Sequence, residues 1–454
     1  MSAPSKLSIL TRSMLSRIAS GDLQPGERLP SVRDAAVLFG VSKNTAVEAY
    51  LRLVAQGVLT AKPGSGYYVT RSGQRGSQPQ NQSVSAATDR ASLLTEQLER
   101  RLKVRPGDGR LPPDWLEESE LRRYLSTSRF QDVDAYNSAW GFLPLRRRLC
   151  GALAERGISC QPDQMLMTHG ANHAMDLIIR RHVSPGDAVL VDDPGYYPLF
   201  AKLTLAGARI IGVPRREDGP DVEALDAAAG ASGARLFFTQ SLAHNPTGGS
   251  ITPGAAYGVL KVANARDLIV VEDDPFADIL PYTTPRLAAL DQLDRVIYLG
   301  TFSKTLAASF RVGYVAASRQ RAAEINELKV ITAVSTSGYD ERLIFGLIDQ
   351  GHYLKHLRRL RSRVSKATTG TLSALAQAGH VIKRPIGGGF YVWLKLPIGT
   401  DMAALNASAA DSGVFIAPGA AFSASPDPAT ANGMRINVAY GADPQFIEWL
   451  QKAI

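Results

Sequence analysis

The chain has 454 residues, of which 45% are hydrophobic and 20% charged, and a net charge of +9. This length accommodates two or three domains, and the composition is that of a soluble globular protein. No apolar run is long enough to span a membrane, and residues 1–6 do not resemble a secretory signal, so we expect a cytoplasmic protein. Cys150, Cys160 and the seven histidines show no disulfide or metal-ligand spacing, so we expect no metal site.

The positive charge is concentrated near the start of the chain. Residues 1–105 hold 15 Lys and Arg against 7 Asp and Glu, whereas the remaining residues hold 36 against 35. A basic segment joined to a nearly neutral body indicates that the segment meets a polyanion.

The first seventy residues predict three helices and a hairpin. An amphipathic helix over 8–19 is followed by a short helix that Ser31 caps, and Ser42 caps a third helix over 43–56. Apolar spacing in the third helix predicts that Val47, Tyr50, Leu51 and Val54 face inward. Segments 58–60 and 67–69 then form a hairpin. Two helices joined by a tight turn, with a hairpin after them, are typical of a winged helix-turn-helix.

The start of the third helix and the tip of the hairpin carry the candidate DNA contacts. A small helical packing module would explain the helices, but not the basic bias, the arginine of the second helix or a glycine-tipped wing. We therefore expect contacts to duplex DNA from Arg33, Ser42, Lys43, Asn44, Thr45, Lys62, Gly64 and Gly66.

A change of composition separates this segment from the rest. Residues 72–92 are rich in Gly, Ser, Gln and Asn and contain few apolar residues. Such a composition is typical of a flexible linker. We predict a DNA-binding domain over 1–71, a linker over 72–95 and a second domain over 96–454.

The second domain alternates strand-like and helix-like segments. Short apolar runs rich in Val and Ile predict an α/β fold whose mainly parallel sheet is covered on both faces. These runs are 188–191, 209–213, 235–239, 268–271, 296–299 and 312–316.

Three polar residues follow the ends of such strands. Asn245, Asp273 and Lys304 each lie at or just beyond an apolar run. Because parallel strands present their carboxyl ends at one edge of a sheet, we expect these side chains to meet in one crevice.

The chemistry of these residues fits pyridoxal 5′-phosphate (PLP). A desolvated lysine such as Lys304 can form a Schiff base with an aldehyde, and Asp273 can hold a pyridine nitrogen protonated. Asn245 can donate to the phenolate oxygen of the ring. Arg311 and the hydroxyl of Ser303 suit a phosphate dianion.

Further candidates follow in chain order. The segment Gly170, Ala171 and Asn172 opens a helix and offers backbone N–H groups to a phosphate. Tyr196 can stack on the ring, and Arg435 is a candidate fork for the carboxylate of an incoming ligand. Each signal is weak alone, but their order along the chain is specific.

Residues 1–71 resemble the winged-helix domain of GntR-type bacterial regulators in the motifs at 29–33, 40–45, 49–50 and 64–66. The family more often has arginine at Lys43, so this chain keeps a phosphate attraction there but loses bidentate reading of guanine. The body resembles the fold-type I aminotransferases over about 350 residues, with a smaller C-terminal subdomain. The whole chain is therefore similar to the MocR subfamily of GntR-type regulators.

The resemblance implies roles for these residues. Lys304 would be the Schiff-base lysine, Asp273 the pyridinium partner, Asn245 the phenolate donor, and Arg435 the carboxylate arginine. Tyr136 would reach the phosphate of the other subunit in a head-to-tail, domain-swapped homodimer.

One departure from the superfamily bears on activity. The superfamily commonly has tyrosine where this chain has Phe276, so the phenolate oxygen loses a donor and transamination should suffer. The adjacent aspartates leave an alternative, in which Asp274 is the ring partner and Phe276 belongs to the core.

Two functions remain open from the sequence. One is a transcription regulator that binds an operator and senses a small amino compound, such as an amino acid, through an external aldimine at the Lys304 site. The other is a working aminotransferase with an accessory DNA-binding domain.

Overall fold

The computed structural model describes two compact units, Met1–Gln82 and Ser83–Ile454. The described residues are most of 10–69, with gaps at 12, 15–16, 19–21, 25, 56–57 and 63–64, together with 87, 92–99, 101–116, 137–276, 278–280, 285–397, 399–424 and 432–454. Most of the linker expected over 72–95 lies outside these ranges. Its last four residues begin helix α5 (Ser92–Glu99), which buries Leu93 and Gln97 and is therefore part of the second unit.

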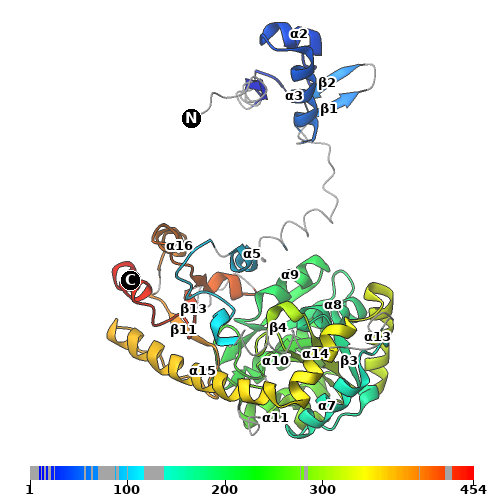
Figure 1. The fold of residues 1–454 in the computed structure, drawn as a ribbon, viewed down its shortest axis with the longest axis vertical. Coiled ribbons are helices and arrows are strands. Elements are labelled where there is room, and N and C mark those ends of the chain that lie inside the picture. Colours follow the sequence, from blue (N-terminus) through cyan, green and yellow to red (C-terminus); the bar gives the residue numbers. More distant parts are fainter. Residues whose placement is uncertain are drawn as a thin grey trace. The chain divides into compact units, whose positions relative to one another are not determined.

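The N-terminal unit contains helices α2 (Val32–Leu38) and α3 (Lys43–Ala55) and an antiparallel hairpin of β1 (Leu59–Lys62) and β2 (Gly66–Val69) (Figure 1). Both caps that the sequence predicts are present. The Ser31 side chain accepts a hydrogen bond from the Asp34 backbone, and Ser42 Oγ accepts one from the Thr45 backbone at 3.1 Å. A helix, a tight turn, a second helix and a hairpin confirm the winged helix-turn-helix.

A small apolar core holds this unit together. Tyr50 is fully buried, and its hydroxyl donates to the Pro30 carbonyl at 2.9 Å, which ties α3 to the segment before α2. The prediction that Leu51 faces inward is wrong, since it is 54% exposed. The buried stripe of α3 lies one residue earlier, at Ala46, Ala49, Tyr50 and Leu53. The core residues are Leu10, Met14, Leu23, Leu29, Ala35, Ala46, Ala49, Tyr50, Leu53, Leu59 and Val69.

The second unit is built on an eight-stranded sheet in the order β3-β10-β9-β8-β7-β4-β5-β6. The pairs β5–β4, β4–β7, β7–β8 and β8–β9 are parallel, which confirms the expected mainly parallel sheet. The strands are β3 (Met165–Thr168), β4 (Ala188–Asp193), β5 (Arg209–Arg216), β6 (Gly219–Pro220), β7 (Leu236–Thr239), β8 (Ile269–Asp273), β9 (Val296–Thr301) and β10 (Gly313–Ala316).

Strand β10 differs from its neighbours in direction. It pairs antiparallel with both β9 and β3, because only a short connection separates it from β9. As a consequence β3 runs in the same direction as β9, and its carboxyl end lies at the same edge of the sheet.

Helices cover both faces of this sheet, and alternate residues of each strand enter different cores. In β9, Val296 and Tyr298 pack in one core while Ile297 and Leu299 pack in the other. The first core receives α7 (Leu143–Ala154), α10 (Val222–Ser232), α11 (Pro253–Ala265), α12 (Leu287–Asp291) and α14 (Gly338–Asp349). The second receives α8 (Ala171–His182), α9 (Tyr197–Leu205) and α13 (Arg319–Ala333).

A smaller C-terminal subdomain follows the long helix α15 (His352–Gln377). Its antiparallel sheet has the order β11-β13-β12, formed by β11 (Tyr391–Lys395), β12 (Ala417–Pro418) and β13 (Gly433–Asn437). Helices α16 (Met402–Asp411) and α18 (Pro444–Ala453) pack in the core of this subdomain. Short 3-10 segments at Pro113–Leu116, Pro162–Gln164, Ala308–Phe310 and Gly419–Phe422 complete the unit. None of the helices described here is long and apolar enough to cross a membrane.

Candidate functional site

The sheet brings the predicted residues to one edge. Asp273 is the last residue of β8, Lys304 follows β9 by three residues, and Asn245 lies in the loop after β7. These three strands are adjacent and parallel, so their carboxyl ends meet. The expectation of a shared crevice thus matches the strand order.

Lys304 projects toward the segment that precedes the large sheet. Its Nζ donates to the Gly109 carbonyl at 2.5 Å, and the Tyr391 hydroxyl donates to the same oxygen at 2.9 Å. Burial lowers the pKa of Lys304 to about 8, and the cations of Arg435 and Arg110 act in the same direction. Much more of this amine is therefore uncharged near neutral pH than in an exposed lysine.

Asp273 is a buried carboxylate that is only half satisfied. Gln240 Nε2 donates to Oδ2 at 2.6 Å, whereas Oδ1 is buried and has no hydrogen-bond partner among the described residues. Burial raises the pKa of Asp273 to about 7, against the lowering effect of the Gln240 hydrogen bond. A buried acceptor without a donor is costly, and such an atom is a point where a ligand can bind.

The neighbouring Asp274 is held by other groups. Its Oδ2 accepts hydrogen bonds from Arg286 Nε at 2.9 Å and from the Tyr298 hydroxyl at 2.8 Å. Arg286 and Asp274 are fully buried, so they form an internal ion pair beneath the sheet edge.

Asn245 and Arg435 are in direct contact. Arg435 Nη1 donates to Asn245 Oδ1 at 2.9 Å, and Nη2 donates to the Gly107 carbonyl at 2.6 Å. Because Oδ1 of Asn245 accepts from the arginine, its Nδ2 group is the one left to donate. Arg435 is 1% exposed, and its guanidinium carbon lies 4.8 Å from the centre of the Tyr391 ring and 4.9 Å from that of the Phe422 ring. Its described partners are neutral, so it remains a buried cation suited to an anionic ligand.

Candidate phosphate-binding groups meet where β3 leads into α8. Gly170 precedes the helix with φ +80°, and a Cβ there would lie 2.9 Å from Arg311 Nη2. Arg311 Nη2 donates to the His169 carbonyl at 3.1 Å, and Nη1 reaches Ser303 Oγ at 3.5 Å. The N–H groups of Ala171 and Asn172 in the first turn of α8 add donors beside this cation.

The two aromatic candidates differ in surroundings. The Tyr196 hydroxyl donates to Asn172 Oδ1 at 3.4 Å, so the ring stands beside the start of α8. Phe276 is buried and packs edge-to-face on Phe390, with ring centroids 4.7 Å apart. Its ring also lies 5.9 Å from that of Tyr391.

The sequence patterns did not identify several residues of the site. Gln240 follows β7 directly and bridges the site, since its Oε1 accepts from the Asn245 backbone while its Nε2 holds Asp273. Its position as a polar residue at a strand end was a usable signal. The carbonyls of Gly107 and Gly109 carry no such signal, because backbone acceptors are not visible in a sequence.

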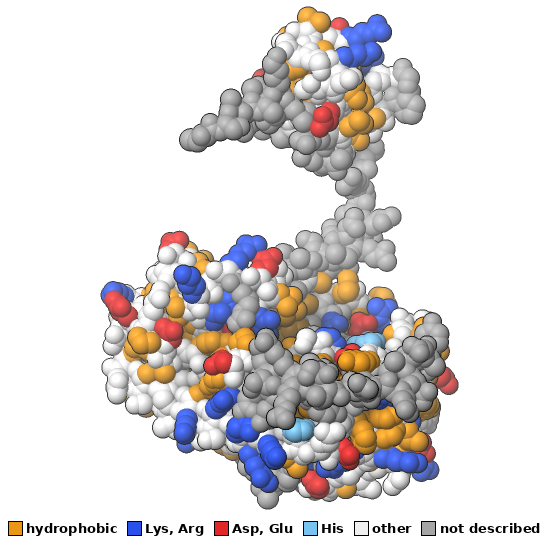
Figure 2. All heavy atoms as spheres, in the orientation of Figure 1, with side chains coloured by type: hydrophobic (Ala, Val, Ile, Leu, Met, Phe, Trp, Pro, Cys, Tyr) orange, Lys and Arg blue, Asp and Glu red, His pale blue; other side chains and the backbone are white. Residues whose placement is uncertain are grey.

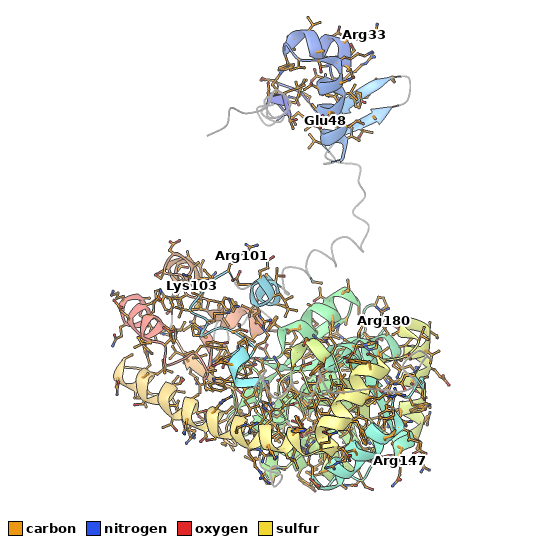
Figure 3. The ribbon with its side chains drawn as sticks, viewed as in Figure 1. Arg33, Glu48, Arg101, Lys103, Arg147 and Arg180 are labelled. Carbon is orange, nitrogen blue, oxygen red and sulfur yellow. The ribbon has the colours of Figure 1, made fainter. Side chains whose placement is uncertain are left out.

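The candidate DNA contacts lie on the surface of the N-terminal unit. Basic side chains project from this unit beside α2 (Figure 2). Arg33 projects from α2, and Glu48 lies on α3 (Figure 3). Ser42, Lys43 and Asn44 are exposed at the start of α3, and Thr45 is half-buried. Gly66 begins β2, and Tyr136, Gly64 and the side chain of Lys62 lie outside the described residues.

Comparisons with known proteins find two families in tandem. The gntR family of bacterial regulatory proteins matches residues 11–69, and the class I and II aminotransferases match residues 104–452. The HTH-type transcriptional regulator YdcR of Escherichia coli (strain K12) is 30% identical over 430 residues, 91% of each chain. The probable rhizopine catabolism regulatory protein MocR of Rhizobium meliloti is 28% identical over 371 residues, 78% of this chain and 73% of that protein. This chain belongs to the MocR-type regulators.

Solved structures agree on the fold of the body of this MocR-type chain. The α-aminoadipate aminotransferase LysN of Thermus thermophilus has a TM-score of 0.73 at 25% identity, covering 81% of this chain and 96% of that chain. That structure is complexed with N-(5′-phosphopyridoxyl)-L-leucine. A kynurenine aminotransferase of Pyrococcus horikoshii has the same TM-score at 28% identity, over 80% and 93% of the two chains. The resemblance and the fold class expected from the sequence are confirmed.

Proposed function

We propose that this protein is a PLP-dependent transcription regulator that binds operator DNA and senses a small amino compound at Lys304. The observation that carries the proposal is the joining of two parts in one chain. One is a winged helix-turn-helix that exposes Arg33 and Lys43. The other is a sheet edge that carries a lysine of lowered pKa and a buried carboxylate with one unpartnered oxygen, with the buried Arg435 in contact with its Asn245.

The residues present fit PLP. The unpartnered Oδ1 of Asp273 supports a pyridinium N–H in that position, and Asp273, Tyr196 and His244 line one small cavity. Gly170 leaves open the space next to Arg311 that a side chain would fill, which supports a phosphate there. When bound, PLP supplies an aldehyde that condenses with primary amines and a ring that withdraws electrons from them.

The pairing of Asp274 with Arg286 supports Asp273 as the ring partner. Asp274 already neutralises a buried cation, so drawing it toward a ring nitrogen would weaken its pair with Arg286. Asp273 has no buried arginine among its described contacts. Oδ1 of both aspartates lacks a hydrogen-bond partner among the described residues, so the ion pair with Arg286 is the feature that distinguishes Asp274 from Asp273.

Each remaining residue then has a defined task. Lys304 supplies an amine that is readily uncharged and can therefore attack an aldehyde. Asn245 Nδ2 donates to the ring oxygen, while Arg435 attracts and orients the carboxylate of an incoming amino acid.

The DNA-binding half of the proposal rests on the N-terminal unit. Lys43, Asn44 and Thr45 at the start of α3 would enter the major groove, and Arg33 would contact the backbone. The wing at 62–66 would contact an adjacent groove or phosphate.

A homodimer belongs to the same proposal. Ile331 and Val334 at the end of α13 and Tyr339 at the start of α14 are 80%, 53% and 46% exposed, which supports burial of this face against a partner. The buried carboxylate of Glu341 accepts hydrogen bonds from Asn137 Nδ2 and from the Phe142 backbone, so the segment that follows Tyr136 is held next to this face.

Aminotransferase activity is a second candidate, since the crevice has the lysine, aspartate and arginine that such enzymes use. Phe276 argues for weak turnover, because it offers the ring oxygen no hydroxyl donor. The test is a spectral titration of the PLP-loaded protein with amino acids, run beside a DNA-binding assay. A regulator gives a saturable absorbance change that alters DNA affinity, whereas steady conversion of an amino acid and an oxo acid favours the enzyme.

A further inference from the structure

A second arginine lies beside the proposed Schiff-base lysine. Arg110 follows Gly109, whose carbonyl accepts the hydrogen bond from Lys304 Nζ. Asn437 Nδ2 donates to the Arg110 carbonyl at 2.8 Å, which fixes the backbone of this residue against β13. The Arg110 cation acts to lower the pKa of both Lys304 and Tyr197.

Arg110 is incompletely satisfied by the protein. Its Nε lies 3.5 Å from Asp108 Oδ1, and its side chain is 30% exposed. Its Nη2 is buried and has no hydrogen-bond partner among the described residues. A guanidinium with one buried, unpaired donor is suited to bind a carboxylate, phosphate or sulfonate that a ligand brings.

The charges around the crevice do not balance. Asp108 is shared, since its Oδ2 accepts from Arg105 Nε at 2.8 Å while its Oδ1 faces Arg110. One carboxylate therefore serves two guanidinium groups, and Arg435 has neutral partners among the described residues. An α-carboxylate bound to Arg435 would neutralise that cation, and Arg110 would still share the single carboxylate of Asp108 with Arg105.

We infer that Arg110 is a specificity-determining residue and that the effector is an amino compound with two anionic groups. This inference rests on the proposed function and narrows its ligand class. One anionic group binds Arg435 and the other, on the side chain of the ligand, binds Arg110 Nη2. The amine of the ligand lies at Lys304, because Lys304 Nζ donates to the Gly109 carbonyl next to Arg110 and Arg435 donates to the Gly107 carbonyl of the same segment.

The test compares acidic ligands with their neutral isosteres. The PLP-loaded full chain is titrated with L-aspartate, L-glutamate and L-2-aminoadipate, and with L-asparagine, L-glutamine and L-homoglutamine. Affinity is followed by cofactor absorbance and by calorimetry. A charge-assisted hydrogen bond predicts that at least one acidic ligand binds about tenfold or more tightly than its neutral isostere.

Substitutions of Arg110 test whether this residue causes the preference for acidic ligands. Arg110→Gln should abolish the preference for acidic ligands while leaving the affinity for neutral ones within about twofold, and Arg110→Lys should keep part of the preference. Arg101→Ala is the matched control, since Arg101 precedes the same segment, is 71% exposed and pairs with Glu99 (Figure 3).

The outcomes separate the two proposals. Equal affinity for acidic and neutral ligands, or a preference that survives Arg110→Gln, would overturn the role of Arg110 and leave the proposed function standing. If no amino compound changes the absorbance of the loaded protein, the proposed function itself fails.

Discussion

Arg435 Nη1 donates to Asn245 Oδ1 at 2.9 Å, which joins a strand of the small subdomain to the loop at the edge of the large sheet. The guanidinium proposed to bind the ligand carboxylate thus orients the amide proposed to bind the cofactor oxygen. A ligand that binds Arg435 therefore also affects this hydrogen bond between the small subdomain and the large sheet. A change in this hydrogen bond would be the first step in passing a signal from the ligand to the rest of the protein.

Replacing Arg435 should separate ligand binding from cofactor binding. Arg435→Gln removes a buried cation, so amino acids should bind about 10- to 100-fold more weakly, while PLP should stay bound through Lys304, Asp273 and Arg311. Absorbance titration with an amino acid and with the matching amine that lacks the carboxylate measures this. An equal loss for both ligands would show that Arg435 does not recognise the carboxylate.

The raised pKa of Asp273 predicts a pH-dependent stability of the protein without cofactor. The pKa is about 7 in the folded protein against an ordinary value of 3.8. The unfolded chain therefore loses this proton first, and the folded state is progressively destabilised as the pH rises from about 4 to 7. Asp273→Asn should remove this penalty, raising the free energy of unfolding at pH 7.5 by up to about 4 kcal/mol relative to the parent.

Urea unfolding of the two proteins without cofactor at pH 4.5 and 7.5 measures the difference. The gain from Asp273→Asn should be small at the lower pH and larger at the higher one. The same gain at both values would contradict the shifted pKa.

The winged helix predicts two kinds of DNA-binding defect. Arg33→Ala should weaken binding to all sequences and reduce the slope of log affinity against log salt by about one unit. Thr45→Ala should instead reduce the difference between operator and unrelated DNA, because Thr45 lies where α3 would meet base edges. Fluorescence anisotropy over a salt series measures both, and binding unaffected by either change would place the DNA contact elsewhere.

The exposed apolar face of α13 predicts self-association. Ile331 is 80% exposed, so Ile331→Asp should disfavour a dimer that buries this face and shift the protein toward monomer in sedimentation analysis. Tyr257→Asp is a control on α11, where the parent side chain is 69% exposed. Equal effects of the two changes would argue against an interface at α13.

The sequence predicted the sheet edge better than its surroundings. Runs of Val and Ile identified the parallel strands, and because such strands end at one edge, the pattern alone could bring Asn245, Asp273 and Lys304 together. The hydrogen bond between Lys304 and the Gly109 carbonyl could not be predicted, since it joins positions 195 residues apart through a backbone atom.

The small subdomain was harder to predict for a different reason. Strand β11 lies in an apolar run, but β12 has only two residues and β13 carries Arg435 and Asn437 among its apolar residues, so the pairing of these strands depends on tertiary packing. Leu51 shows the same limit in the N-terminal unit. Helical spacing alone could not reveal that the small side chains of Ala46 and Ala49 would turn toward the core.

The most direct test of the proposed regulator compares DNA binding by the PLP-loaded parent protein and by Lys304→Ala. Each is titrated with the amino acid that changes the cofactor absorbance of the parent most. In the parent, this ligand should change operator affinity by about 5- to 150-fold, as expected for a coupling free energy of about 1–3 kcal/mol. In Lys304→Ala it should change the affinity little or not at all. An equal change in both proteins would contradict sensing through Lys304.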